Sequence, residues 1–180
     1  MTAPVEPSIV IRQASDADLP QLTTIYNHYI QHSVATFDVK PFTVEKRRAE
    51  WFSHYAQAGR YRIFVAEQGG AVLGFTYSSQ FRRKAAYDSS VETSVYCAPG
   101  QTGNGLGRRL YAALFDALRV EGVHQAFALI SLPNDASEKF HARFGFQRSG
   151  VMRDAGRKFD RYVDVAVFQR TVEASRVEST

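Results

Sequence analysis

The sequence contains a single cysteine, Cys97, among 180 residues. One cysteine cannot form a disulfide within the chain, and it cannot supply the several thiolates of a cysteine-rich zinc site. No stretch approaches the roughly 18 consecutive apolar residues of a membrane helix, and the N-terminal segment MTAPVEPSIV lacks the basic start and apolar run of an export signal. These absences favour a cytoplasmic enzyme with no metal and no membrane partner.

Long runs of basic residues are absent as well, although the net charge is +4 and the isoelectric point is near 9.3. The 22 basic residues are interspersed with 18 acidic ones, and the longest basic run is Arg82-Arg83-Lys84. We therefore expect no nucleic-acid partner, although a basic module that binds RNA or a nucleotide without catalysis stays open as an alternative.

The composition favours one domain. With 44% hydrophobic and 13% aromatic residues, the chain can bury a single sizeable core. We expect this domain to span residues 8–170, with flexible termini at 1–7 and 171–180.

Hydrophobic patterning predicts an alternation of strands and helices. Strands are expected over residues 8–14, 61–67, 71–79, 90–98, 124–132, 145–152 and 161–170, and helices over 19–33, 44–59, 105–121 and 134–144. Gly69-Gly70 favours a two-residue hairpin turn, and the polar segment 153–160 is expected as a turn between the last two strands. The order βααβββαβαββ indicates a mixed α/β layer architecture.

The segment QTGNGLGRRL, residues 101–110, opens a helix in an unfavourable way. Glycine costs backbone entropy, and Arg108 and Arg109 place positive charge at the positive end of the helix dipole. A phosphate-bearing ligand on the first turn would offset both effects, because glycine permits close approach and free N–H groups bind its oxygens. The alternative is a flexible loop with two solvated arginines. A Walker loop would need Gly-Lys-Ser/Thr here, and a dinucleotide fingerprint would need glycine at 108.

Several segments of the chain resemble the phosphinothricin N-acetyltransferase group of the GCN5-related N-acetyltransferases (GNAT). They are IYNHYIQHSVATF (25–37), AYDSSVETSVYCAPG (86–100), LPNDAS (132–137), FHARFGF (140–146) and GRKFDRYVDVAVFQ (156–169), together with the glycine loop before the third long helix. One departure is Thr102, which stands where the superfamily usually has Gln or Arg. The resemblance implies a GNAT fold, with helices on both faces of a central mixed sheet.

The same resemblance implies acetyl-CoA as cosubstrate and the α-amino group of a small amino acid or analogue as acceptor, such as phosphinothricin, methionine sulfoximine or methionine sulfone. The pantetheine arm is expected along the strand before Pro99, and the pyrophosphate on the amides of the glycine loop. The implied cofactor-binding residues are Val95, Tyr96, Cys97, Gly103, Asn104, Gly105, Leu106, Gly107, Arg108, Asn134 and Ser137.

The resemblance places two residues in catalytic roles. Glu92 occupies the position of the general base that deprotonates the amine, with a solvent-facing strand carboxylate as the alternative. His141 stands where other GNAT enzymes have a tyrosine that protonates the leaving thiolate, with a structural histidine among phenylalanines as the alternative. An acetyl-enzyme intermediate on Cys97 is disfavoured, because no histidine lies near it in sequence.

The acceptor carries a carboxylate and is expected to need cations around it. The implied substrate-binding residues are Phe37, Arg82, Arg83, Lys84, Tyr87, Glu92, Thr93 and Ser94, although the basic triplet is equally consistent with an ordinary surface loop. Relatives in this group are commonly homodimers, so a homodimer is expected. Acetylation of a protein or peptide amine is the alternative enzymatic reading.

Overall fold

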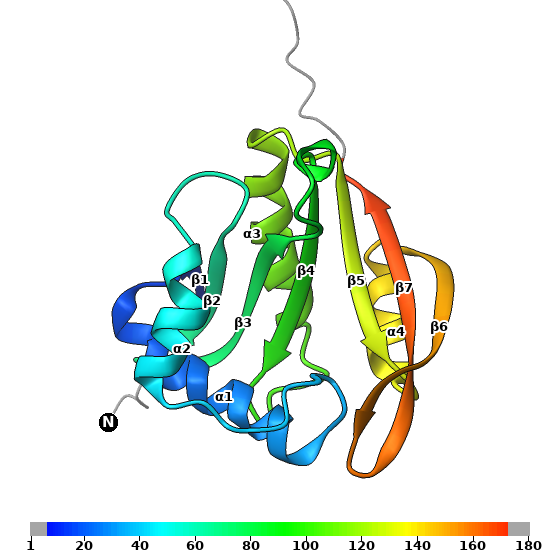
Figure 1. Cartoon of the computed structure of the whole chain (residues 1–180). Helices are drawn as coiled ribbons and strands as arrows, with labels where there is room; N and C mark the ends of the chain where they lie inside the picture. The colour runs from blue at the N-terminus through cyan, green and yellow to red at the C-terminus, as the bar shows by residue number, and fades with distance from the viewer. Residues whose placement is uncertain (1–6, 173–180) are drawn as a thin grey trace, which may run out of the picture.

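A seven-stranded mixed β-sheet forms the centre of the molecule (Figure 1). The computed structural model describes residues 7–172. In spatial order the strands are β1 (Val10–Gln13), β2 (Ile63–Gln68), β3 (Ala71–Gln80), β4 (Ser90–Cys97), β5 (Gln125–Ser131), β7 (Arg161–Thr171) and β6 (Gln147–Lys158). All neighbouring strands are antiparallel except β4 and β5, which run parallel. The predicted mixed sheet is confirmed.

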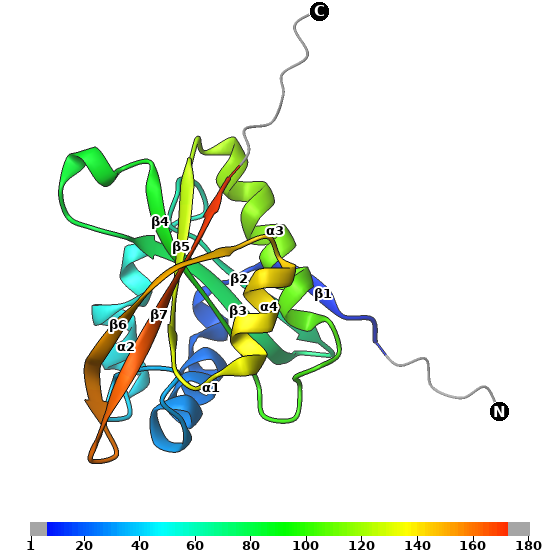
Figure 2. The ribbon, with the colours of Figure 1, turned by 90° about the vertical axis from the view of Figure 1, so that its right-hand side faces the viewer.

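Helices cover both faces of the sheet, as expected (Figure 2). Helices α1 (Leu19–His32) and α2 (Val44–Glu50) lie on one face, and α3 (Leu106–Val120) and α4 (Asp135–Arg143) on the other. Short 3₁₀ turns occur at Asp16–Asp18, Phe52–His54 and Ala85–Tyr87. Because side chains alternate along a strand, Tyr96 packs with the α1 side, whereas Val95 and Cys97 pack against the first turns of α3.

Strands β4 and β5 are joined over only part of their length. Their register comprises three residue pairs, from Ser90 opposite Gln125 to Glu92 opposite Phe127. On its other side β4 pairs with β3 along seven residues, up to Cys97. Figure 1 shows β4 and β5 diverging toward their C-terminal ends beyond the paired segment. Among residues 7–172, one edge of β4 therefore has no strand partner from Thr93 onward.

The helix expected over residues 44–59 is wrong in its second half. Helix α2 ends at Glu50, and Trp51 leaves the helical conformation with φ of −136° and ψ of −59°. A short 3₁₀ turn follows and positions Trp51 and Tyr55 against Tyr77 of β3, at ring-centroid distances of 5.3 and 5.9 Å. The packing of these rings on the sheet overrides the helical pattern of the local sequence.

The turn expected over residues 153–160 is also wrong in extent. Strand β6 continues to Lys158, and only Phe159 and Asp160 form the turn, with φ values of 50° and 56°. Positive φ at both central residues is typical of a two-residue hairpin turn. Most side chains of β6 are exposed, so this edge strand lacks the alternation of apolar residues that predicts a strand.

The terminal segments expected to be flexible fall mainly outside the described residues. Of 1–7 and 171–180, the structure describes Pro7, Thr171 and Val172. Thr171 belongs to β7, and Val172 is buried, with its N–H donating to the carbonyl of His124 at 2.8 Å.

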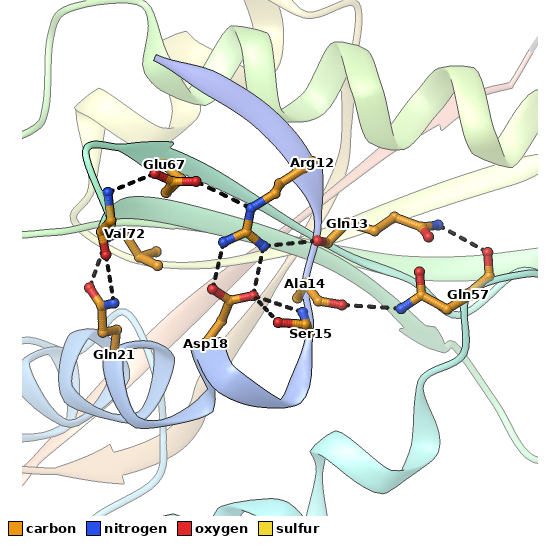
Figure 3. A network of polar contacts seen from close by, with 10 residues as sticks. Arg12, Gln13, Ala14, Ser15, Asp18, Gln21, Gln57, Glu67 and Val72 are labelled. Atoms are coloured by element: carbon orange, nitrogen blue, oxygen red, sulfur yellow. Dashed lines mark hydrogen bonds and ion pairs between the residues drawn. The ribbon is translucent and has the colours of Figure 1, made fainter. Parts of the chain in front are cut away.

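A polar network fixes the start of α1 to the first strand (Figure 3). The Arg12 guanidinium donates to both carboxylate oxygens of Asp18 at 2.8 Å, and the Ser15 N–H donates to Asp18 at 2.7 Å. Arg12 also reaches Glu67 of β2 at 3.4 Å. These contacts, above all the hydrogen bond from Arg12, hold the pKa of the Asp18 carboxyl below its ordinary value.

We expect Asp18→Asn to lower the free energy of unfolding by about 1–2 kcal/mol, because it removes a charge-assisted pair whose arginine is partly solvated. Since the folded-state pKa of Asp18 is depressed, its stabilisation is complete above the unfolded pKa of about 4 and is lost as the pH falls through the folded value. Urea unfolding at pH 7 and pH 3 measures both effects. Asp16→Asn, which alters an exposed pair with Arg48, is the control. Equal effects of the two substitutions would contradict this account.

Candidate functional site

A cavity of about 670 Å³ opens where β4 and β5 diverge. Its walls come from β4, from the loop before α3, from β5 and from α4. All of the residues expected to bind the cofactor line it, together with Thr93, Ser94 and His141. These segments are far apart along the chain, and the fold brings them together around a single cavity.

The unpaired edge of β4 forms one side of the cavity. From Val95 to Cys97 this edge has no neighbouring strand in the described sheet, so it can accept an extended ligand as an added strand would be accepted. Thr93 marks the point of separation, because its hydroxyl donates to the carbonyl of Phe127 at 3.2 Å, just beyond the last backbone pair.

The glycine loop takes the conformation that its sequence requires. Gly103 and Gly105 have φ values of +85° and +79°, which only glycine adopts without strain, and neither would bring a Cβ within 4 Å of other atoms. The Asn104 side chain accepts the N–H of Leu106 at 3.2 Å. The next two N–H groups of the helix start have no hydrogen bond within the described residues. They belong to Gly107 and Arg108, which both line the cavity.

The two arginines of this helix start do different things. Arg108 lines the cavity, whereas Arg109 donates to the carbonyl of Ile9 at 2.8 Å and thereby ties α3 to the N-terminal end of β1. Of these two arginines, Arg108 is therefore the one placed to meet an anion in the cavity.

Helix α4 begins in the cavity wall. Asn134 caps it by accepting the N–H of Ser137 at 3.2 Å, as the sequence indicated. Asn134 and Ser137 both line the cavity, and each has a polar side chain, an amide and a hydroxyl.

His141 sits deeper on the same helix and is 4% exposed. Its Nδ1 lies 2.8 Å from the carbonyl of Ser137, an acceptor, so Nδ1 carries the proton and Nε2 accepts from the Tyr111 hydroxyl at 3.0 Å. Burial lowers the pKa of His141 to about 4. The ring is therefore neutral at pH 7. The expected role, protonation of the leaving thiolate, would instead require a charged imidazolium.

Tyr111 on α3 is a site residue that the sequence analysis missed. Its hydroxyl contacts both His141 and, at 3.4 Å, Thr93. Burial raises the pKa of this phenol, so the hydroxyl keeps its proton. In the sequence Tyr111 reads as one more apolar residue on the inward face of α3, beside the leucines at 106, 110, 114 and 118, so no local signal distinguishes it.

Glu92 lies on the opposite face of β4 from Thr93 and does not line the large cavity. Burial raises the pKa of its carboxyl above the ordinary value, and the charge of Arg82 acts in the opposite direction. This partly desolvated environment is typical of a carboxylate that acts as a base, and it differs from that of a solvated surface carboxylate. Ser94 and Tyr96 share this face, and Ser94 borders the large cavity.

The basic loop after β3 is held beside Glu92 by aromatic stacking. The Phe81 ring stacks on Phe127 of β5 at 3.9 Å, and Tyr87 contacts Phe81 edge to face at 5.7 Å. Arg82 lies over the Phe81 ring at 4.4 Å and acts on the Glu92 carboxyl. The other two cations of the triplet, Arg83 and Lys84, are exposed.

Phe37 belongs to the loop between α1 and α2, and this loop is fastened to the last hairpin. A Cβ built on Gly156 would lie 2.3 Å from the Phe37 ring, so the ring lies directly on the β6 backbone. Beside it the buried ammonium of Lys158 donates to the Thr36 carbonyl at 2.7 Å. Phe37 is 37% exposed and remains available to a ligand.

Comparison with known proteins agrees with this geometry. The family model described as the acetyltransferase (GNAT) domain matches residues 11–167. The chain is 48% identical to a phosphinothricin N-acetyltransferase of Streptomyces coelicolor, covering 90% of this chain and 95% of that protein. It is 35% identical to an L-methionine sulfoximine/L-methionine sulfone acetyltransferase of Pseudomonas paraeruginosa, covering 94% and 98%.

Among solved structures, a GNAT superfamily phosphinothricin acetyltransferase of Sinorhizobium meliloti, in complex with acetyl-CoA, superimposes with a TM-score of 0.85. It is 33% identical, and the match covers 96% of this chain and 93% of that one. The chain belongs to the GNAT acetyltransferase family. Within that family it is an N-acetyltransferase, similar to enzymes that acetylate amino-acid analogues. No helix within residues 7–172 is long and apolar enough to cross a membrane.

We expect His141 to titrate near pH 4 and to stay neutral from pH 5 to 8, because burial disfavours its charged form. Its folded pKa lies below the ordinary value of 6.5, so the unfolded chain takes up the proton first and stability declines as the pH falls from 6.5 toward 4. NMR titration of the histidine ring carbons measures this pKa, with the exposed His54 as an internal reference. An inflection of His141 near pH 6.5 would contradict the assignment.

Proposed function

We propose that this enzyme transfers the acetyl group of acetyl-CoA to the α-amino group of a small amino acid or analogue of the phosphinothricin, methionine sulfoximine or methionine sulfone type. The observation that carries the proposal is the cavity at the divergence of β4 and β5, with the glycine loop at one end and Glu92 on the adjoining strand face. The names of the relatives at 48% and 35% identity support the choice of acceptor.

The residues that line the cavity suit acetyl-CoA. The unpaired edge of β4 would hold the pantetheine amides, and the free amides at the start of α3 with the Arg108 side chain would hold the phosphates. The cosubstrate supplies the activated acetyl group as a thioester. On the α4 side, the Asn134 amide and the Ser137 hydroxyl are polar groups of the lining, together with the charged side chains of Lys139 and Arg143.

Glu92 is the proposed general base. An ammonium group has no lone pair, so the acceptor must lose a proton before it can attack, and a carboxylate with a raised pKa is a better proton acceptor than a solvated one. The proton moves to Glu92 directly or through one water molecule. The charge of Arg82 opposes the rise in the Glu92 pKa and so favours the ionised carboxylate.

His141 and Tyr111 are proposed to act as a pair beside the departing thiolate. The neutral ring of His141 lines the cavity and fixes the direction of the Tyr111 hydroxyl, which is buried behind it and keeps its proton. In this arrangement His141 positions the phenol and does not itself supply the proton.

The acceptor is proposed to lie on the Glu92 face of β4, between the loop after α1 and the basic loop after β3. Arg82, Arg83 and Lys84 supply positive charge for its carboxylate, while Ser94 and Phe37 bound its amine end and its side chain. Thr93 is set apart from this group, because its hydroxyl is engaged on the α3 side.

We expect Glu92→Gln to lower kcat by about 10²-fold or more, since general-base catalysis contributes on that order. The Kd for acetyl-CoA should stay nearly unchanged, because Glu92 does not line the cofactor cavity. A thiol-release assay with a panel of amines, including methionine sulfone and a short peptide, measures kcat, and titration calorimetry measures Kd.

In the wild type, kcat/KM should rise with pH along a limb whose pKa lies above 4.5, the ordinary carboxyl value, and the limb should vanish in the variant. Unchanged turnover in Glu92→Gln would remove this residue from catalysis. Acetylation of the peptide alone would refute the choice of acceptor, and no binding of acetyl-CoA by the wild type would refute the donor site.

We further propose that the chain is a homodimer. The edge strand β6 and its hairpin expose apolar side chains, including Met152, Phe159 and Tyr162, which are 41%, 54% and 67% exposed. Exposed apolar side chains on an edge hairpin offer a surface to a second copy of the chain. Light scattering should give twice the 20.2 kDa chain mass, and Tyr162→Lys should lower it to that of one chain. A monomeric wild type would refute the proposal.

A further inference from the structure

A second cavity, of about 330 Å³, lies beside the proposed acceptor face of the sheet. Its walls are mainly aromatic rings from α1, the α1–α2 loop, α2 and β3. The lining residues are Tyr26, Asp38, Phe42, Arg47, Glu50, Trp51, Tyr55, Tyr77 and Ser79.

Arg47 is the unusual member of this lining. It is 4% exposed, and its Nε and Nη2 atoms are buried without any hydrogen-bond partner within the described residues. The guanidinium lies over the rings of Tyr26 and Trp51, 3.8 and 4.0 Å from their centroids. The rings stabilise the cation through their faces, but they offer its N–H groups no acceptor. Burial of a guanidinium without an acceptor is unfavourable, so this position favours a ligand that supplies an acceptor oxygen.

The two acidic residues of the lining have cations of their own. The carboxylate of Glu50 is exposed and lies 3.8 Å from the ammonium of Lys46. Asp38 accepts the Tyr26 hydroxyl at 2.6 Å, and its charge raises the pKa of Lys158, which burial lowers more strongly. Neither carboxylate is within ion-pair distance of Arg47. Arg47 is therefore the cation of this cavity that lacks an anion among the described residues.

The strand register places this cavity next to the proposed reaction centre. Ser79 and Tyr77 of β3 line it, and they pair directly with Glu92 and Ser94 of β4. Directly opposite residues of antiparallel strands lie about 4.5–5.5 Å apart. An amino acid whose amine is at Glu92 therefore needs a side chain of only three or four atoms to bring its end group over β3 and toward Arg47.

We propose that this cavity is the subsite for the acceptor's side chain and that Arg47 donates hydrogen bonds to an oxygen at the end of that side chain. The inference rests on the proposed function and deepens it. It selects acceptors whose side chain ends in an oxyanion or a strongly dipolar oxygen, such as a phosphinate or a sulfone, over acceptors of the same length that end in an apolar group.

Methionine sulfone and methionine are a matched pair of acceptors, because they differ only in two oxygens on sulfur. We expect Arg47→Met to lower the ratio of kcat/KM for the sulfone to that for methionine by about tenfold or more, the range of one charge-assisted hydrogen bond. The loss should appear in KM, with kcat nearly unchanged. Arg47→Lys, which keeps a cation, should retain part of the ratio.

Arg48→Met is the matched control, since Arg48 is the next residue of α2, is exposed and pairs with Asp16 at the surface. It should leave the ratio unchanged. Thermal unfolding and the Kd for acetyl-CoA show whether each variant is folded. An unchanged ratio in a folded Arg47→Met, or equal changes in both arginine variants, would overturn the proposal.

Direct binding gives a readout that does not depend on turnover. Trp51 is the single tryptophan of the sequence and lines this cavity, so its fluorescence reports on what enters. Methionine sulfone should change the emission in a saturable way, methionine should not, and Arg47→Met should abolish the response. No response in the wild type would overturn the proposal even if an arginine variant failed to fold. A wild type that acetylates neither amine would refute the proposed function, and the fluorescence titration would still decide the subsite.

Discussion

The short pairing of β4 with β5 is the constraint on which the site depends. After three residue pairs the two strands separate, and the Thr93 hydroxyl takes the place of the next backbone contact by binding the Phe127 carbonyl. This separation exposes the backbone of β4 as a ligand edge, opens the cavity over α3 and α4, and leaves the opposite face of the same strand to carry Glu92. In the proposed arrangement, one strand presents its edge to acetyl-CoA and its face to the acceptor amine.

The chemistry of the site depends on buried polar groups, and burial affects the protonation state of each in a different way. Burial raises the pKa of Glu92 and lowers that of His141, which favours a ready proton acceptor on one face of β4 and a neutral ring on the other. The hydrogen bond from Tyr111 to His141 is possible only while that ring is neutral. Arg47 differs from these groups, because its guanidinium lies against aromatic faces and its Nε and Nη2 have no hydrogen-bond partner among the described residues.

The sequence predicted the elements whose pattern is local. The apolar pattern predicted β2, β3 and β4, and the leucine spacing predicted α3. Asn134 predicted the start of α4. The glycine loop predicted a ligand site at the start of α3, because glycine at these positions indicates a backbone with positive φ that a ligand can approach closely. The end of α2 at Glu50 and the extent of β6 escaped prediction, since long-range packing and edge pairing decide them. Tyr111 and Arg47 were not predicted as site residues for a related reason. Tyr111 matters because folding places its hydroxyl against His141, and Arg47 matters because folding buries its guanidinium without a hydrogen-bond acceptor.

The contact between Phe37 and Gly156 has a consequence for how such enzymes diversify. The aromatic ring occupies the space of a side chain at 156, so the two positions share one volume. A side chain at 156 therefore requires a smaller residue at 37 first. The reverse order of substitutions passes through a steric clash. Sequence drift around the acceptor should therefore show covariation of these two positions, with glycine retained wherever the aromatic residue is.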